Sequence, residues 1–296
     1  MNASSSPVSA ARPRSVAVVG AGRLGSVLAR ALEEAGSAVH GPLRRGDSVP
    51  VVDVALLCVP DAAIHDAAAA VRPHARLVGH VSGATGLDDV DFNIHPLQTF
   101  TGSESPAVFH GIGAAIDGRT AEARATAEGL ARALGARPFR VDEAQRAGYH
   151  ASASIASNLL LAVLDAAERV AGSAGIAPDD ARALLAPLVH QTATNWAERG
   201  AADALTGPIA RGDEGTVARQ RTAVAEGNSE MLALVDALTA QTRVLAESAG
   251  GRPSSRFADP ERPSSRSADP ERGAERRDEG RSGTGAGDAV DRKDRA

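Results

Sequence analysis

The chain has 296 residues, a formal net charge of −5 and an apolar share of 43%, enough for one or two domains with hydrophobic cores. Few aromatic residues and no basic block occur in its body, so nucleic-acid binding is not indicated. No apolar run approaches the roughly eighteen residues of a membrane span, and the N-terminus lacks the hydrophobic core of a signal peptide; we therefore expect a soluble, cytoplasmic protein without a membrane partner.

Lysine is almost absent from the chain. The only one is Lys293, in the C-terminal tail. Its position excludes a lysine Schiff base, a P-loop lysine and the lysine half of many dehydrogenase acid–base pairs from the body of the protein. The single cysteine, Cys58, lies in an apolar run and is expected to be a buried thiol with no disulfide partner; no metal site is predicted.

An N-terminal domain of the doubly wound α/β class is predicted for residues 13–142, after a flexible leader at 1–12. Apolar strand-like runs there alternate with helical segments, which is typical of a parallel sheet. The expected strands are 16–19, 38–43, 53–59, 76–81, 91–94, 113–116 and 138–141, and the expected helices are 23–35 and 121–134.

The first strand runs directly into a glycine-rich turn, Val-Ala-Val-Val-Gly-Ala-Gly-Arg-Leu-Gly at 16–25. Gly20 would make the tight turn, Gly22 would let a diphosphate approach the backbone, and Gly25 would let the next helix pack closely on the sheet. The free N–H groups at that helix N-terminus would bind the diphosphate; the alternative is a glycine-rich turn without a ligand. The cofactor-binding candidates in this stretch are Gly20, Gly22, Arg23, Leu24 and Gly25.

The choice between NAD and NADP is expected to be made after the second strand. An acidic residue that would bind the ribose of NAD is missing between Gly36 and Gly46. Arg44 and Arg45 stand there instead, and they could pair with a 2′-phosphate. This pattern favours NADP over NAD, unless both arginines are only solvated surface residues.

The loops after the third and fourth strands should line the crevice, because ligands of open α/β sheets bind at the carboxyl ends of the strands, and a polar cluster on a turn follows at 94–100. His95 is a candidate proton donor, while Ser82 could orient a substrate or, with Gly83, simply form a turn. The candidates are Val59 and Pro60 for the cofactor, Ser82 for both ligands, and Gly83, Gln98 and Thr99 for the substrate.

From residue 143 to 249 the strand signals stop and an all-helical domain is predicted. The expected helices are 143–172, 178–200 with a kink at Pro187, 216–226 and 228–249. Residues 250–296 form a polar, mixed-charge tail in which 252–261 is repeated almost unchanged at 262–271, and they are predicted to be disordered.

Two features of the helical domain carry candidate site residues. His150, Ser154 and Asn158 recur every four residues and so share one helix face, which would line a cavity or, alternatively, face solvent. The loop 205–213 interrupts the helices with glycine and proline, and there Thr206 and Arg211 could bind an anionic substrate; alternatively the loop is only a connector.

These motifs together resemble the Rossmann-like proteins that carry the domain of unknown function 2520, relatives of the 6-phosphogluconate dehydrogenase and pyrroline-5-carboxylate reductase superfamily. The matching stretches are 20–25, His80-Val-Ser-Gly83, His95-Pro-Leu-Gln-Thr-Phe100, Tyr149-His150 with Ser157-Asn158, and Leu205-Thr-Gly-Pro208 with Arg211-Gly-Asp213. The resemblance covers about residues 14 to 245. It implies a Rossmann domain, a 6-phosphogluconate-dehydrogenase-like helical domain that forms a homodimer, and NADP-linked oxidoreductase activity. In the wider superfamily a lysine precedes the asparagine by four residues, and Ser154 takes that position here.

The leading hypothesis is an NADP-dependent oxidoreductase that reduces a small carbonyl or imine, for example an oxo acid such as ketopantoate. Ser82 and Asn158 would orient the substrate, His150 or His95 would donate the proton, and Arg211 would hold a carboxylate. The alternative is a non-catalytic NADP-binding sensor or assembly protein of the same fold. A deazaflavin in place of the nicotinamide is a third, weaker possibility.

Overall fold

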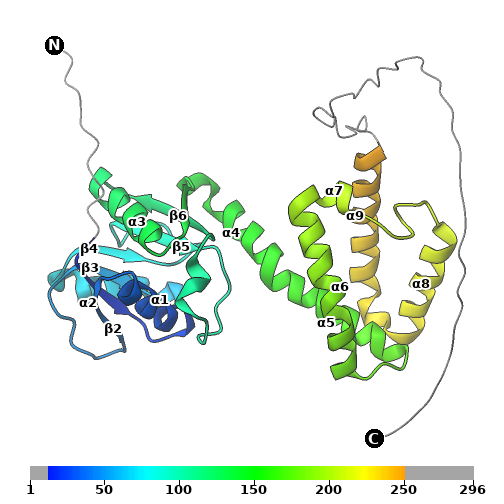
Figure 1. Ribbon diagram of the computed structural model, residues 1–296, viewed down its shortest axis with the longest axis horizontal. Helices are drawn as coiled ribbons and strands as arrows, with labels where there is room; N and C mark the ends of the chain where they lie inside the picture. The colour runs from blue at the N-terminus through cyan, green and yellow to red at the C-terminus, as the bar shows by residue number, and fades with distance from the viewer. Residues whose placement is uncertain (1–12, 251–296) are drawn as a thin grey trace, which may run out of the picture.

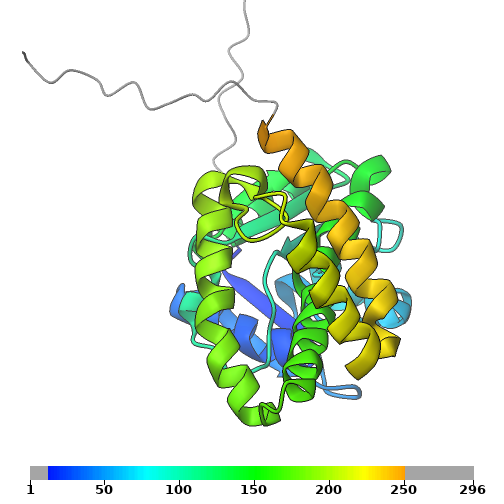
Figure 2. The same cartoon turned by 90° about the vertical axis from the view of Figure 1, so that its right-hand side faces the viewer.

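The computed structural model describes residues 13–250, so the predicted leader and the tail beyond residue 250 lie outside the described residues. An α/β domain and a helical bundle follow each other along the long axis (Figure 1). Figure 2 looks along this axis and shows the bundle in front of the α/β domain. The connection between the two parts is a helical rod that begins with α4 (Arg146–Ser154).

The α/β domain contains a seven-stranded sheet in the order β2-β1-β3-β4-β5-β6-β7. The strands are β1 (Ser15–Val19), β2 (Ala38–Leu43), β3 (Val52–Leu57), β4 (Ala75–His80), β5 (Phe92–Pro96), β6 (Gly113–Gly118) and β7 (Arg137–Arg140). All seven predicted strands are confirmed, each within two residues of its predicted bounds. The Rossmann-like class is also confirmed, with the order of the strands reversing between β1 and β3.

One pairing differs from the predicted parallel sheet, because β6 runs antiparallel to β5, with Asn93 opposite Asp117. The connection between these strands contains only the short 3₁₀ helix η3 (Pro106–Phe109). A parallel neighbour needs a long crossover, usually an α-helix, whereas an antiparallel neighbour does not. The parallel pair β4–β5 is also joined without a helix, so the connection alone does not set the direction of β6.

Both faces of the sheet are covered by helices. Along β3, Val54 and Leu56 belong to one apolar cluster while Ala55 and Leu57 belong to another, because successive side chains of a strand point to opposite faces. The first cluster includes buried residues of α1 (Arg23–Glu34) and α3 (Ala121–Ala133), and the second includes those of α2 (Ile64–Val71). The structure thus confirms the two predicted helices and adds α2, which was not predicted from the sequence.

The rod and the bundle contain the predicted helices of the second half. After the short 3₁₀ helix η4 (Glu143–Gln145), α4 continues into a π-helical turn, η5 (Ile155–Leu159), and then into α5 (Leu160–Ser173). The bundle is completed by α6 (Pro178–Arg199), α7 (Ala201–Ala204), α8 (Glu214–Gly227), the 3₁₀ helix η6 (Ser229–Met231) and α9 (Leu232–Gly250).

Candidate active site

The glycine-rich turn after β1 is as tightly packed as the predicted tasks of Gly20 and Gly25 require. Gly20 has a φ of +117°, and a Cβ on it would lie 2.3 Å from the carbonyl oxygen of Cys58. A Cβ on Gly25 would lie 2.0 Å from the carbonyl oxygen of Gly20, so α1 packs directly on the turn. Gly22 has no atom within 4 Å of its would-be Cβ, and this open position is where a diphosphate needs access to the backbone.

The N-terminus of α1 is free of side-chain competitors. Gly22 is its N-cap, no side chain caps the helix, and its first turn contains no acidic residue. Arg23 is exposed, whereas Leu24 packs against the core and would offer a ligand only its backbone N–H. An uncapped N-terminus of a twelve-residue helix is favourable for a phosphate group.

The arginines proposed to select NADP follow β2, next to the glycine turn. The N–H of Gly20 donates to the carbonyl oxygen of Leu43 at 2.8 Å, which joins the turn to the end of β2. Arg44 and Arg45 are exposed and form no ion pair with any residue in the range 13–250. Asp47 folds the loop back by accepting the N–H of Arg44 at 2.7 Å. Both guanidinium groups are therefore available to an anion.

Val59 and Pro60 follow β3 at the reversal of the strand order. Val59 is half-buried, and its side chain lies beside Gly20, 3.3 Å from the would-be Cβ. Pro60 is exposed and precedes a short 3₁₀ helix, η1 (Asp61–Ala63). The preceding thiol is no nucleophile at neutral pH, since burial raises the pKa of Cys58 to about 12.

The loop after β4 is held by its own hydrogen bonds. The hydroxyl of Ser82 accepts the N–H groups of Ala84 at 3.1 Å and Thr85 at 3.0 Å, as in a turn. His80 is buried; its Nδ1 accepts the N–H of Ser82 at 3.1 Å, and its Nε2 lies 2.9 Å from the carbonyl oxygen of Gly86. The geometry favours the turn interpretation for Ser82, whose hydroxyl is already engaged.

Gly83 lies between two histidines, one from the sheet and one from α4. A Cβ on Gly83 would lie 2.8 Å from Nε2 of His95 and 2.9 Å from Cδ2 of His150. The two imidazole rings are 6.2 Å apart. Nδ1 of His95 lies 2.6 Å from the hydroxyl of Tyr149, which precedes His150 on α4. The first turns of α4 thus bring two titratable rings to the carboxyl end of β5.

Burial dominates the electrostatics of this cluster. It lowers the pKa of His95 to about 4, with additional lowering by the neighbouring His150 and Arg146. It raises the pKa of Tyr149 to about 12, against the opposing effect of Arg146. At neutral pH His95 is therefore neutral and Tyr149 is protonated. Within residues 13–250, no group of three or more His, Cys, Asp or Glu side chains is placed to hold a metal ion.

Arg146, the first residue of α4, connects the helix to the sheet. Its Nε donates to Glu143 at 2.8 Å, and its Nη2 lies 3.7 Å from Oδ2 of Asp117 on β6. Only 4% of its side chain is exposed, and Nη2 is buried without a hydrogen-bond partner among the residues that the structure describes. Sequence reasoning gave no role to Arg146 or Tyr149; for Tyr149 its position beside His150 was the available signal.

The remaining predicted site residues are exposed. Gln98 and Thr99 are exposed after β5, where the N–H of Thr99 donates to the side chain of Gln98. Asn158 is exposed in η5, and Thr206 and Arg211 are exposed between α7 and α8, within the bundle (Figure 1). Within one chain, the loop between α7 and α8 that carries Thr206 and Arg211 lies in the bundle and not beside the sheet (Figure 1).

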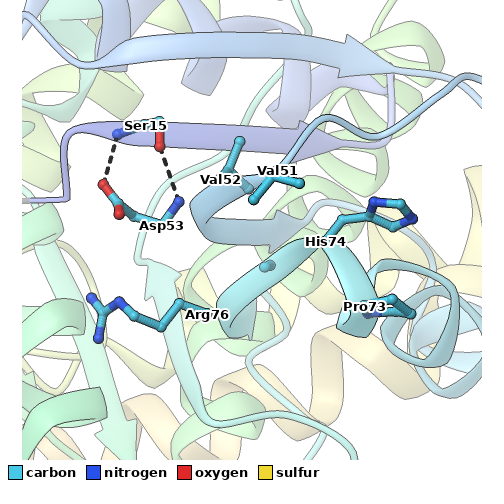
Figure 3. Close-up of a pocket in the computed structure, with 8 residues that line it drawn as sticks. Ser15, Val51, Val52, Asp53, Pro73, His74 and Arg76 are labelled. Atoms are coloured by element: carbon cyan, nitrogen blue, oxygen red, sulfur yellow. Dashed lines mark hydrogen bonds between the residues drawn. The ribbon is translucent and has the colours of Figure 1, made fainter.

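A hollow of about 470 Å³ lies at the opposite, amino ends of the strands (Figure 3). Two of its lining residues, Ser15 and Asp53, form a reciprocal pair of hydrogen bonds. Asp53 accepts the N–H of Ser15 at 3.1 Å, and the hydroxyl of Ser15 accepts the N–H of Asp53 at 3.0 Å. The N–H of Arg14 also donates to Asp53, at 2.8 Å. Ligands of open α/β sheets bind at the other end, so we interpret these bonds as structural.

The comparisons with known proteins agree with this architecture. Residues 112–242 match the family described as Domain of unknown function (DUF2520), a range that includes β6, α3, β7 and most of the helical part. No curated protein matches the sequence.

Solved structures match most of the chain. A Bacteroides fragilis protein named as a candidate NADP oxidoreductase is 21% identical, with 78% of this chain and 98% of that chain covered and a TM-score of 0.65. A Thermotoga maritima protein is 22% identical, with 79% and 98% covered and a TM-score of 0.65. Plasmodium falciparum pyrroline carboxylate reductase with NADP bound is 10% identical, with 78% and 98% covered and a TM-score of 0.51. Likeness at these identities concerns the fold.

Proposed function

We propose that the chain, whose residues 112–242 match the DUF2520 family and whose fold is Rossmann-like, is an NADP-dependent oxidoreductase that reduces a small carbonyl or imine. The observation that carries the proposal is the juxtaposition at one sheet edge of an open glycine turn and a histidine cluster. Gly22 leaves the N-terminus of α1 accessible to a diphosphate, and Gly83 brings His95 and His150 together at the same carboxyl edge. One group of residues would bind the cofactor and the other would handle the proton.

The residues fit a dinucleotide. The N-terminus of α1 would hold the diphosphate, Val59 and Pro60 would border the nicotinamide side, and Arg44 or Arg45 would bind a 2′-phosphate. When bound, the reduced cofactor supplies hydride to the substrate carbon. His95 or His150 then provides the hydrogen bond and the proton for the substrate oxygen or nitrogen.

The substrate class follows from the candidate residues of the helical part of the chain. Arg211 would bind the carboxylate of an oxo acid such as ketopantoate, with Thr206 and the amide of Asn158 as hydrogen-bonding groups. In one chain these residues lie away from Gly83, so we propose that a second copy supplies them.

A homodimer through the helical part also accounts for its exposed apolar surface. On η5, α5 and α6 the following residues are each more than half exposed: Ile155, Leu159, Leu161, Leu184, Leu188 and Trp196. Soluble monomers rarely leave such a group uncovered, and a second copy offers the same surface for an isologous contact.

The helix of residues 143–173 is also long and apolar enough to span a membrane, by length and composition. However, Arg182 of α6 pairs with Glu168 of α5 at 2.8 Å, so α5 belongs to a folded bundle. We therefore favour a second copy over a lipid bilayer as the cover of the apolar surface.

Sedimentation of the full chain tests the dimer. The wild type should sediment as a dimer and Leu161→Glu as a monomer. The matched control is Val51→Glu, which changes an exposed residue of the α/β domain and should leave the dimer intact. A monomeric wild type, or a protein that floats with vesicles, would contradict the proposal.

The activity is tested by NADPH oxidation with a panel of oxo acids, including ketopantoate, and cyclic imines. Turnover that falls in His95→Gln or His150→Gln supports the oxidoreductase. Tight NADPH binding without oxidation of any substrate would support the second candidate, a non-catalytic NADP-binding sensor or assembly protein. That candidate is favoured by the absence of lysine throughout residues 13–250 and by the engaged hydroxyl of Ser82.

A further inference from the structure

The proposed reaction assigns no role to Tyr149. Its side chain nevertheless contacts His95, one of the two candidate proton donors. It is the only tyrosine of the chain and lies half-buried on α4. Its ring packs edge-on against His95 at 5.5 Å between centroids and against Phe139 at 5.8 Å. The ring is thus held on two sides, and its hydroxyl lies 2.6 Å from Nδ1 of His95.

The two protonation states allow the hydroxyl of Tyr149 to donate to Nδ1 of His95. The half-buried Tyr149 keeps its proton, and the half-buried His95 is neutral at neutral pH. A neutral imidazole has one N–H and one acceptor nitrogen. If the hydroxyl of Tyr149 donates to Nδ1, the ring proton of His95 must be on Nε2.

Nε2 of His95 is turned toward Gly83. A Cβ at Gly83 would be 2.8 Å from this nitrogen, so only glycine leaves that edge of the ring uncovered. In contrast to Nδ1, Nε2 has no hydrogen-bond partner within the described range 13–250. The donor is therefore directed at the end of the sheet where the substrate of the proposed reaction would lie.

We propose that Tyr149 is a positioning residue that holds His95 as the neutral Nε2–H tautomer, and that this N–H donates to the carbonyl oxygen or imine nitrogen of the substrate. This inference rests on the proposed function. It identifies His95, rather than His150, as the proton donor. His95 is also uncharged over the whole range around neutral pH.

The proton balance closes without a charged imidazole. As hydride adds to the substrate carbon, the π electron pair of the C=O bond moves to oxygen, which takes the proton from Nε2. Nδ1 takes the hydroxyl proton of Tyr149 in the same step, so His95 remains neutral. The tyrosinate left behind lies near the positive charge of Arg146; water then protonates Nε2 while Nδ1 returns its proton to Tyr149, which restores the starting tautomer.

Histidine NMR tests the tautomer without requiring turnover. The full chain labelled with ¹⁵N-histidine should give the Nε2–H pattern for His95, which is assigned by its loss in His95→Gln. In Tyr149→Phe, which keeps the ring and its packing on Phe139, His95 should lose its single tautomer. His80 is the internal control, because its own partners, Ser82 and Gly86, are unchanged.

An Nδ1–H pattern in the wild type, or an unaltered His95 pattern in folded Tyr149→Phe, would overturn the inference. In the activity assay, Tyr149→Phe should lower kcat by about 10- to 100-fold with little change in KM. Normal turnover of Tyr149→Phe beside an inactive His95→Gln would refute the positioning role alone. An inactive wild type with the expected NMR pattern would refute the proposed function instead.

Discussion

Replacing glycine by alanine should have different effects at Gly22 and at Gly25, in the glycine-rich turn after β1. In Gly25→Ala the new Cβ would start 2.0 Å from the carbonyl oxygen of Gly20, whereas real Cβ contacts shorter than 3.0 Å essentially do not occur. The first turn of α1 must therefore move by about 1 Å, from 2.0 to 3.0 Å. In Gly22→Ala the Cβ meets nothing within 4 Å, so the fold should not change.

The cost of Gly25→Ala can be worked out from this displacement. Overpacking that shifts backbone costs about 1–3 kcal/mol, and here the moving helix also carries the buried side chains of Val27, Leu28 and Leu32. We expect the upper end, about 3 kcal/mol, which lowers the Tm by roughly 6–12 °C for a domain of this size. Gly22→Ala should unfold within about 1 °C of the wild type, because its Cβ has open space.

Thermal unfolding followed by circular dichroism and calorimetric titration with NADPH separate the two effects. Gly25→Ala should lose stability and affinity together. Gly22→Ala should lose only affinity, because its methyl group would occupy the approach of the diphosphate. Equal Tm values for the two variants would refute the packing argument, and undiminished NADPH binding by Gly22→Ala would refute the placement of the diphosphate.

Three further predictions concern other parts of the α/β domain. Replacing Arg44 and Arg45 together by alanine should weaken NADPH binding about tenfold or more and leave NADH binding unchanged; equal losses for both cofactors would contradict a 2′-phosphate site. Gly83→Ala should remain folded, because the new Cβ meets only ring atoms of two histidines, but should lose most turnover in the NADPH assay. Hydrogen bonding, chiefly from Ser15, lowers the pKa of Asp53 below 3.8, so its carboxylate stabilises the fold above that value. The Tm advantage of the wild type over Asp53→Asn should therefore shrink as pH falls from about 6 to about 2.5, and a constant difference would contradict this linkage.

Much of the fold could be predicted from the sequence because apolar alternation and glycines are local signals. Val54 and Leu56 alternate with Ala55 and Leu57, and both faces of β3 are indeed buried. The direction of β6 could not be predicted, since a short apolar strand looks the same in parallel and antiparallel pairing.

Only part of the candidate site could be predicted from the sequence. Gly83, His95 and His150 could be named because each lies at a strand end or on a polar helix face. The contact between His95 and Tyr149 spans 54 residues and exists only because α4 returns to the end of β5. Arg146 could not be predicted as a buried residue, because arginine is almost never fully buried unless paired.

The π-helical turn η5 changes the direction in which Asn158 faces. A π turn holds one more residue than an α turn, so Asn158 has a different angular relation to His150 and Ser154 than an unbroken α-helix would give. The wider turn takes up the extra residue, so deleting one residue of η5 would restore a regular helix and leave the rotation of α5 about the rod nearly unchanged. The extra residue therefore redirects one amide side chain and keeps the bundle where it is.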